Sequence, residues 1–274
     1  MIIGDLAVDY TLPLEDAQTQ IFDLPSPLVG GTALNAAKSF LETSELFPIL
    51  FGRIGDDLDG EFVLNEINRL RLTALIGRSH KKRTGTCTLL YNNNTDSRIM
   101  IKDERRNAND YYLGDIEQAL QIAKLSVKDF VFLICHSMVR IGMDHADKMR
   151  ELIANKTSNS RVVLDLVPHN MYEVIDRGSF LEFCRKYEHY AIIAEMPTIS
   201  GLLCEMRTNI PTEEALVCFS SALKCNWLIL RFGAGNIGMQ AIYRQIDGQY
   251  TLVRSMPTGY ENYKLTNESD LATR

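Results

Sequence analysis

The chain has 274 residues, of which 46% are hydrophobic, 23% charged and 8% aromatic, and its formal net charge is -6. This length and composition are typical of a globular protein with one large domain or two small ones, and they exclude a disordered, collagen-like or coiled-coil chain. The negative charge argues against a nucleic-acid partner, and the longest uncharged apolar run, 130–139, is about half as long as a membrane-spanning helix.

The first third of the sequence predicts alternating strands and helices, followed by a hairpin. Apolar spacing indicates, in order, a strand over 1–8, a helix over 33–41, a strand over 47–52 and a helix over 58–70. The pattern then changes, because two β-rich runs, 84–91 and 98–101, flank the polar turn 92–96. This segment predicts a β-hairpin set into an otherwise α/β chain.

From Gly114 onward, helical and strand-like segments alternate regularly. The predicted helices are 116–123, 144–154, 180–187 and 212–223, and the predicted strands are 130–135, 162–166, 190–194 and 227–232. Continuous apolar strands separated by helices predict a parallel sheet covered on both faces. After Phe232, two strands over 239–245 and 250–254 flank the turn Asp247-Gly248.

The cysteine pattern indicates free thiols. The sequence has six cysteines, with no C-x-x-C pair and no zinc-like spacing to the histidines. Cys87, Cys135 and Cys218 lie in apolar runs, where a free thiol packs as a small hydrophobic group. Together with an N-terminus that has no secretory signal, this pattern predicts a reducing, cytoplasmic location.

Three glycines near the end of the α/β pattern form a literal G-x-G-x-x-G motif, at Gly233, Gly235 and Gly238. Such a motif after a strand would suit a nicotinamide-dependent oxidoreductase, provided that a helix begins at the third glycine and holds the pyrophosphate. The next residues, 239–243, are typical of a strand. The sequence therefore favours a glycine-rich connection between two strands, with the oxidoreductase as an alternative function.

Two other glycines, Gly30 and Gly31, directly precede the first predicted helix, and Asn35 lies one turn into it. Glycines let the backbone approach a ligand closely, and the Asn35 amide offers one donor group and one acceptor. The alternative is an unusual helix start with Asn35 facing solvent. A second glycine-rich turn, 51–60, contains an aspartate that predicts a helix cap.

These two motifs, Gly30-Gly31-x-x-x-Asn35 and Gly52-x-x-Gly55-Asp56-Asp57-x-x-Gly60, resemble the N-terminal signature of the ribokinase (PfkB-type) carbohydrate kinase family. The resemblance implies one three-layer α/β domain over 1–274, with a mainly parallel central sheet and a small β lid from about 10–28 and 83–101. It also implies a sugar or nucleoside between lid and sheet, bound by Asp5 (in place of an Asn of the family), Asp9, Gly30, Gly31 and Asn35.

The same resemblance implies that ATP and Mg²⁺ bind near the later strands. The segment 230–238 is similar to the strand and glycine loop at the family's nucleotide site, and Val163-Leu164-Asp165 is similar to a strand that ends in Asp. The family's Asn-x-x-Glu motif is replaced here by Glu195 and Thr198, and Glu195 is the expected magnesium ligand. The nucleotide-binding residues implied are Glu195, Thr198, Arg231, Gly233, Gly235 and Gly238.

The family's second signature, a Gly-Ala-Gly-Asp-like segment whose Asp takes the proton of the acceptor hydroxyl, has no counterpart in this sequence. The catalytic residue is therefore unknown. We expect ATP-dependent phosphorylation of a sugar or nucleoside by a kinase of which this chain is a truncated form, or, as the alternative, a non-catalytic pseudokinase that binds a small polar ligand. Exposed lid strands also suggest a homodimer formed through the lid.

Overall fold

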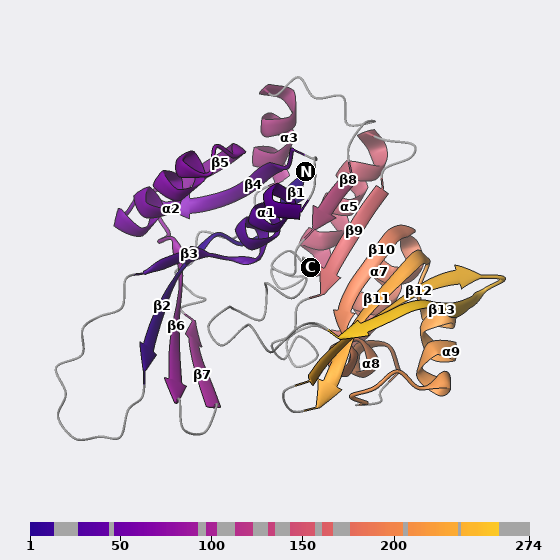
Figure 1. Cartoon of the computed structure of the whole chain (residues 1–274). Coiled ribbons are helices and arrows are strands. Elements are labelled where there is room, and N and C mark those ends of the chain that lie inside the picture. Colours follow the sequence, from indigo (N-terminus) through magenta and orange to yellow (C-terminus); the bar gives the residue numbers. More distant parts are fainter. Residues whose placement is uncertain are drawn as a thin grey trace.

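The apolar strands assemble into a nine-stranded sheet, and the hairpin belongs to a separate four-stranded sheet (Figure 1). The structure is a computed structural model. It describes residues 1–13, 27–43, 47–92, 97–102, 113–122, 131–134, 143–156, 161–166, 176–204, 208–234 and 237–257.

The large sheet has the strand order β13-β12-β11-β10-β9-β8-β1-β4-β5. Its strands are β1 (Ile2–Ile3), β4 (Ile49–Gly55), β5 (Thr73–Ser79), β8 (Val131–Ile134), β9 (Arg161–Leu166), β10 (His189–Glu195), β11 (Cys225–Ala234), β12 (Ile237–Ile246) and β13 (Gln249–Pro257). From β5 to β11, both included, neighbouring strands in this order pair in parallel. The pairs β11–β12 and β12–β13 are antiparallel. The mainly parallel sheet that the sequence predicts is confirmed.

Helices pack on both faces of this sheet. They are α1 (Thr32–Thr43), α2 (Leu58–Arg69), α3 (Leu113–Ile122), α5 (Met143–Lys156), α7 (Arg177–Lys186), α8 (Met196–Cys204) and α9 (Glu213–Ala222). Ile2 belongs to the core cluster that contains apolar residues of α1 and α2, and Ile3 to the one that contains those of α7, α8 and α9. Because successive strand residues point to opposite faces, the two clusters lie on opposite sides of the sheet, which makes the three layers.

The smaller sheet is the β lid, and its strand order is β3-β2-β6-β7. Its strands are β2 (Ala7–Pro13), β3 (Leu28–Gly30), β6 (Gly85–Asn92) and β7 (Ser97–Lys102). Strands β6 and β7 form the antiparallel hairpin that the sequence predicts, and β2 pairs in parallel with β6. Residues 14–26, which belong to the expected lid segment, lie outside the described residues.

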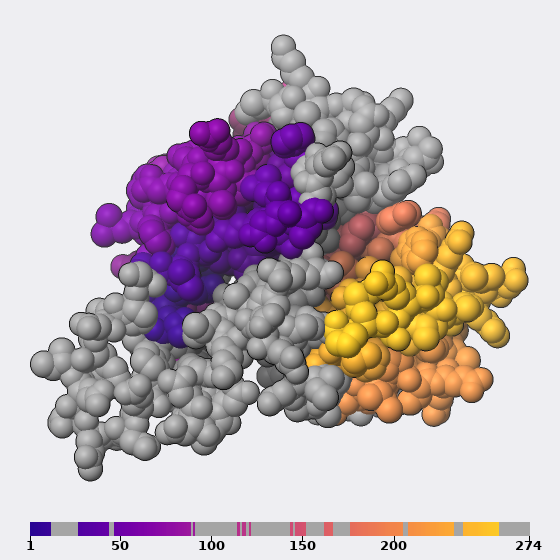
Figure 2. Space-filling model, viewed as in Figure 1, coloured from indigo at the N-terminus to yellow at the C-terminus, as the bar shows by residue number. Residues whose placement is uncertain are grey.

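The single strand predicted over 1–8 is wrong. The chain leaves the large sheet after Ile3 and enters the lid at Ala7. Helix α1 fixes the segment between these two strands, because the Ala33 amide donates to the Asp5 carbonyl at 3.2 Å. In the space-filling view, residues of α1 and α2 lie on one side of the molecule and those of β12, β13 and α9 on the other (Figure 2).

The interpretation of Cys218 as a free thiol is also wrong. Cys218 of α9 forms a disulfide with Cys204, the last residue of α8, whereas Cys87, Cys184 and Cys225 are free and buried. The two half-cystines meet because α8 and α9 pack against each other. The cysteine pattern therefore no longer supports a reducing compartment; Cys135 lies outside the described residues. In the part of the chain that is described, no helix is both long and apolar enough to cross a bilayer.

Candidate functional site

The predicted acceptor residues lie on or beside β2, β3 and α1, three elements that meet at Gly30 and Gly31. In the lid ladder, Ala7 pairs with Gly30 and Asp9 with Leu28. The structure thus brings Asp9 of β2 next to the strand that ends at Gly30, and Asn35 follows within the first turns of α1.

Gly31 fixes the close approach between α1 and the chain that enters the lid. Its φ is +95°, and a Cβ at this position would lie 2.8 Å from the Asp5 carbonyl carbon and 2.9 Å from the Ala7 amide nitrogen. A residue with a side chain would be strained in that conformation and would overlap backbone. The glycine is therefore needed to hold Asp5, Gly31 and the start of α1 together.

The acceptor cluster is polar but buried. Asp5 is 8% exposed, Asp9 6% and Asn35 9%. Thr32, which directly follows the two glycines, is 9% exposed, and its Oγ1 has no hydrogen-bond partner among the described residues. Sequence reasoning missed Thr32, although its position between Gly31 and Asn35 was a usable signal. Two carboxylates, an amide and a hydroxyl supply the donors and acceptors that hydroxyl-rich ligands need.

A second buried polar group lies on the later strands of the large sheet. Strand β10 separates β9 from β11, and Ile193 of β10 pairs with Asp165 on one side and Ile229 on the other. Across β10, the Arg231 guanidinium contacts the Asp165 carboxylate with 3.3 Å between Nη2 and Oδ1. Burial raises the pKa of the Asp165 carboxyl, and the Arg231 charge opposes that rise.

Arg231 has hydrogen-bonding capacity beyond this pair. The residue is 5% exposed, and within the described residues its Nε and Nη1 atoms have no hydrogen-bond partner. Unmet donors on a buried guanidinium are costly, and a phosphate oxygen is the type of acceptor that matches its fork of N–H groups. Arg231 therefore fits an anionic ligand at the carboxyl end of β11.

Glu195 and Thr198 take different positions at this edge. Glu195 ends β10 and pairs in register with Arg231, so their side chains share one face of the sheet. Thr198 lies in α8 and is 3% exposed, within the core. No group of three or more His, Cys, Asp or Glu side chains suited to a metal occurs in the described part of the chain. The Glu195 carboxylate is a hard oxygen ligand that could hold a magnesium ion together with phosphate and water oxygens.

The G-x-G-x-x-G motif spans the end of β11 and the start of β12. Gly233 pairs with Gly238, and Ala234 with Ile237, in the antiparallel ladder of β11 and β12. Gly238 lies in a strand, so the helix that a dinucleotide fingerprint requires does not begin there. This removes the basis of the oxidoreductase alternative; Gly235 itself lies outside the described residues.

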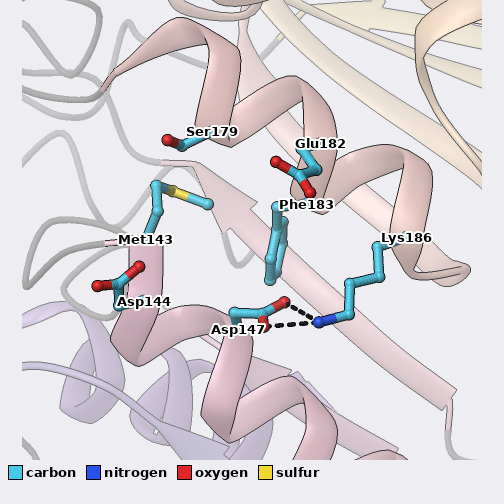
Figure 3. Close-up of a pocket in the computed structure, with 7 residues that line it drawn as sticks. All are labelled: Met143, Asp144, Asp147, Ser179, Glu182, Phe183 and Lys186. Carbon is cyan, nitrogen blue, oxygen red and sulfur yellow. Dashed lines mark hydrogen bonds and ion pairs between the residues drawn. The ribbon is translucent and has the colours of Figure 1, made fainter.

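A separate cavity of about 180 Å³ lies between α5 and α7 (Figure 3). Its lining residues are Met143, Asp144, Asp147, Ser179, Glu182, Phe183 and Lys186. The Lys186 ammonium pairs with both Asp147 carboxylate oxygens, at 2.6 and 2.9 Å. None of the predicted site residues lines this cavity, so we do not assign it to the acceptor or nucleotide site.

The chain has the fold of solved sugar kinases. A ribokinase from Giardia lamblia matches with a TM-score of 0.69 and 14% identity, over 92% of this chain and 73% of that chain. A fructokinase from Xylella fastidiosa with bound ATP matches with a TM-score of 0.68 and 12% identity, over 92% and 77% of the two chains.

A 2-dehydro-3-deoxygluconokinase from Thermotoga maritima gives a TM-score of 0.66 at 13% identity, with coverage of 93% of this chain and 79% of that one. Neither a family model nor a curated protein sequence matches this chain. At these identities the likeness establishes the ribokinase-like α/β fold, as the glycine motifs predict.

Proposed function

We propose that this protein is a PfkB-type carbohydrate kinase, which transfers the terminal phosphoryl group of ATP to a hydroxyl of a sugar or nucleoside. The observation that carries the proposal is the pair of unmet donors on the buried Arg231 guanidinium. They lie at the carboxyl end of β11, in the sheet that also includes β1, whose carboxyl end leads into the acceptor cluster. Ligands of open α/β sheets bind at the carboxyl ends of the strands.

On the acceptor side, the Asp9 carboxylate and the Asn35 amide would hold the sugar hydroxyls, and Asp5 would lie beside them. The backbone of Gly30 and Gly31 would lie against the sugar without side-chain obstruction. Because these side chains are buried, their hydrogen bonds to a ligand would compete with little bulk water.

On the nucleotide side, ATP supplies the phosphoryl group when it binds. Arg231 would hold phosphate oxygens through Nε and Nη1, and Glu195, Thr198, Gly233, Gly235 and Gly238 would lie around the nucleotide. Glu195 would contact magnesium as an oxygen ligand, with weak affinity, because the Thr198 hydroxyl replaces a carboxylate of the family motif. Positioning and charge stabilisation of this kind account for most of phosphoryl-transfer catalysis.

A second candidate function is ligand binding without turnover. It is favoured by the absence of a Gly-Ala-Gly-Asp-like segment from these 274 residues. Loss of a general base costs about 10²–10⁴-fold in rate. On this second candidate, the 274-residue chain would bind ATP and a sugar but form little sugar phosphate. A homodimer through the lid and a cytoplasmic location remain predictions.

The test is a thermal-shift panel with Mg·ATP, NAD⁺, D-ribose, D-fructose and 2-dehydro-3-deoxygluconate, followed by an assay for ADP formation. A ligand at 100 times its Kd stabilises the folded state by about 2.7 kcal/mol, which is readily measured. We expect stabilisation by ATP and by one sugar, and none by NAD⁺. Stabilisation by NAD⁺ alone would overturn the proposal, and ADP formation with a sugar would exclude the non-catalytic alternative.

A further inference from the structure

The second glycine-rich motif, 52–60, has no ligand role in the proposed function, yet the structure gives it another one. The motif lies where β4 ends and α2 begins, and it contacts Thr84, the residue directly before lid strand β6. We propose that Asp57 and Asp59 of this motif hold the β lid in the orientation that places Asp9 in the acceptor site. This inference rests on the proposed function, because the acceptor role of Asp9 comes from it.

Three hydrogen bonds join the base of β6 to the end of β4. The Asp57 carboxylate accepts from the Thr84 amide at 2.9 Å and from the Thr84 hydroxyl at 2.6 Å. The same hydroxyl accepts from the Gly55 amide at 2.9 Å. Thr84 is 3% exposed, so solvent hardly competes for these bonds. The contact is therefore a firm anchor for the lid rather than a surface contact.

The spacing of the motif's glycines follows from this anchor. A Cβ on Gly55 would lie 2.5 Å from the Thr84 amide nitrogen, and one on Gly60 would lie 3.0 Å from the Thr84 hydroxyl oxygen. The Gly60 amide also donates to Asp57 at 2.9 Å, which makes Asp57 the N-cap of α2. Gly55 thus makes room for Thr84, whereas a Cβ on Gly60 would first meet the Gly55 carbonyl oxygen at the first turn of α2.

A second anchor joins α2 to the neighbouring lid strand. The Tyr10 hydroxyl of β2 donates to the Asp59 carboxylate at 2.6 Å. This bond, together with burial and the charges of Asp59 and Asp57, raises the pKa of Tyr10 to about 12. Side chains alternate along a strand, so fixing Tyr10 on α2 turns its neighbour Asp9 to the opposite face of the lid.

The two anchors act on adjacent strands of one ladder. Ala7 pairs with Gly85, and Asp9 pairs with Cys87. Because Gly85 directly follows Thr84, the Thr84 anchor fixes where β6 begins. The pairing of β6 with β2 then fixes the position of Asp9. In Figure 1, β2, β6 and β7 extend away from the α2 end of the molecule as a narrow sheet. Asp57 and Asp59 are therefore positioning residues for the acceptor site.

The test compares amide hydrogen exchange in full-length variants without ligand. Thr84→Val removes the hydroxyl and keeps the side-chain shape, and Tyr10→Phe removes only the phenolic oxygen. Asp57→Ser retains a capping oxygen for Gly60 but is too short to reach Thr84. The matched control is Asp56→Asn, because the exposed Asp56 carboxylate pairs with Arg78 and His80 instead.

We expect β2 and β6 amides to exchange about 5- to 30-fold faster in Thr84→Val and Asp57→Ser, and β2 amides about 5-fold faster in Tyr10→Phe, the effect of losing one or two net hydrogen bonds. Exchange in β10 and β11 should stay unchanged, and the control should match wild type throughout. Unchanged exchange of the β2 and β6 amides in Thr84→Val and Asp57→Ser would overturn the role of Asp57, and unchanged exchange of the β2 amides in Tyr10→Phe would overturn that of Asp59.

Calorimetry then separates positioning from general damage to the structure. The probe is the sugar among D-ribose, D-fructose and 2-dehydro-3-deoxygluconate that stabilises wild type most. We expect sugar affinity to fall by about 5- to 30-fold in Thr84→Val and Asp57→Ser, while ATP affinity is kept. Unchanged sugar affinity, or equal losses for sugar and ATP, would overturn the positioning role. If wild type binds none of these sugars, the proposed function fails, and the exchange comparison alone decides whether the motif holds the lid.

Discussion

Replacing Gly31 with alanine should destabilise the protein at the start of α1. Gly31 has a φ of +95°, and an added Cβ would lie 2.9 Å from the Ala7 amide nitrogen and even closer to the Asp5 carbonyl group. A positive φ costs a residue with a Cβ about 1–2 kcal/mol, and overlap with backbone that is fixed on both sides adds about 1–3 kcal/mol. We therefore expect the free energy of unfolding to fall by about 2–5 kcal/mol, measured by urea denaturation.

Gly248 provides the matched control. Its φ is +80°, but a Cβ there would meet nothing within 4 Å. Gly248→Ala should therefore show only the backbone cost, about 1–2 kcal/mol. The difference between the two variants isolates the close approach of α1 to the chain that enters the lid. Equal losses in the two variants would refute that packing as the reason for Gly31.

Three further predictions concern the disulfide, the lid anchor and the acceptor site. Reducing the Cys204–Cys218 bond, which spans a sequence separation of 14 residues, should lower the free energy of unfolding by about 3 kcal/mol, and the double variant Cys204→Ser/Cys218→Ser should show no further response to reductant. Burial alone would raise the pKa of Asp57, but hydrogen bonds from the Thr84 hydroxyl and from the Thr84 and Gly60 amides, with the Arg83 charge, outweigh it and hold the pKa below its usual 3.8. Ionised Asp57 therefore adds stability above that usual value and loses it as pH falls through the lower folded-state pKa. The stability difference between wild type and Asp57→Asn in urea denaturation should shrink on acidification, and a constant difference would contradict the assignment. Asp9→Ala should weaken sugar binding by about 1.5–3 kcal/mol in calorimetry without unfolding the protein, and equal binding would remove Asp9 from the acceptor site.

The regular α/β part of the fold follows from local sequence. Strands such as 190–194 and 227–232 are continuous apolar runs, and the helices between the strands have amphipathic spacing. Strands and helices could therefore be predicted without knowledge of tertiary contacts. Helix α8 was missed because it is nearly all buried and carries Pro197 at its second position, so it has no polar face to reveal a period. The break between β1 and β2 was missed because only Gly4 and Asp5 interrupt an otherwise apolar run over residues 1–8.

The site residues divide in the same way. The placement of Gly30, Gly31 and Asn35 at the start of the first helix could be predicted, because their spacing is local and chemically unusual; their binding role stays a prediction. The Arg231–Asp165 contact joins residues 66 positions apart, and the disulfide depends on how α8 packs on α9. The bond between Asp57 and Thr84 likewise depends on where the lid meets α2. Such contacts arise from tertiary packing, which spacing along the chain does not encode.

The most direct test of the central claim is the affinity for Mg·ATP, measured by calorimetry in wild type and in Arg231→Met. The control is Arg244→Met, because Arg244 is exposed on the neighbouring strand β12 and lies over the Trp227 ring. Loss of charge-assisted hydrogen bonds worth about 1.5–3 kcal/mol should weaken ATP binding about 10- to 150-fold in Arg231→Met, while the control binds as wild type does and sugar binding is kept in both. Equal ATP affinity in all three proteins would contradict the placement of the phosphates at Arg231, and no ATP binding by wild type would contradict the kinase assignment itself.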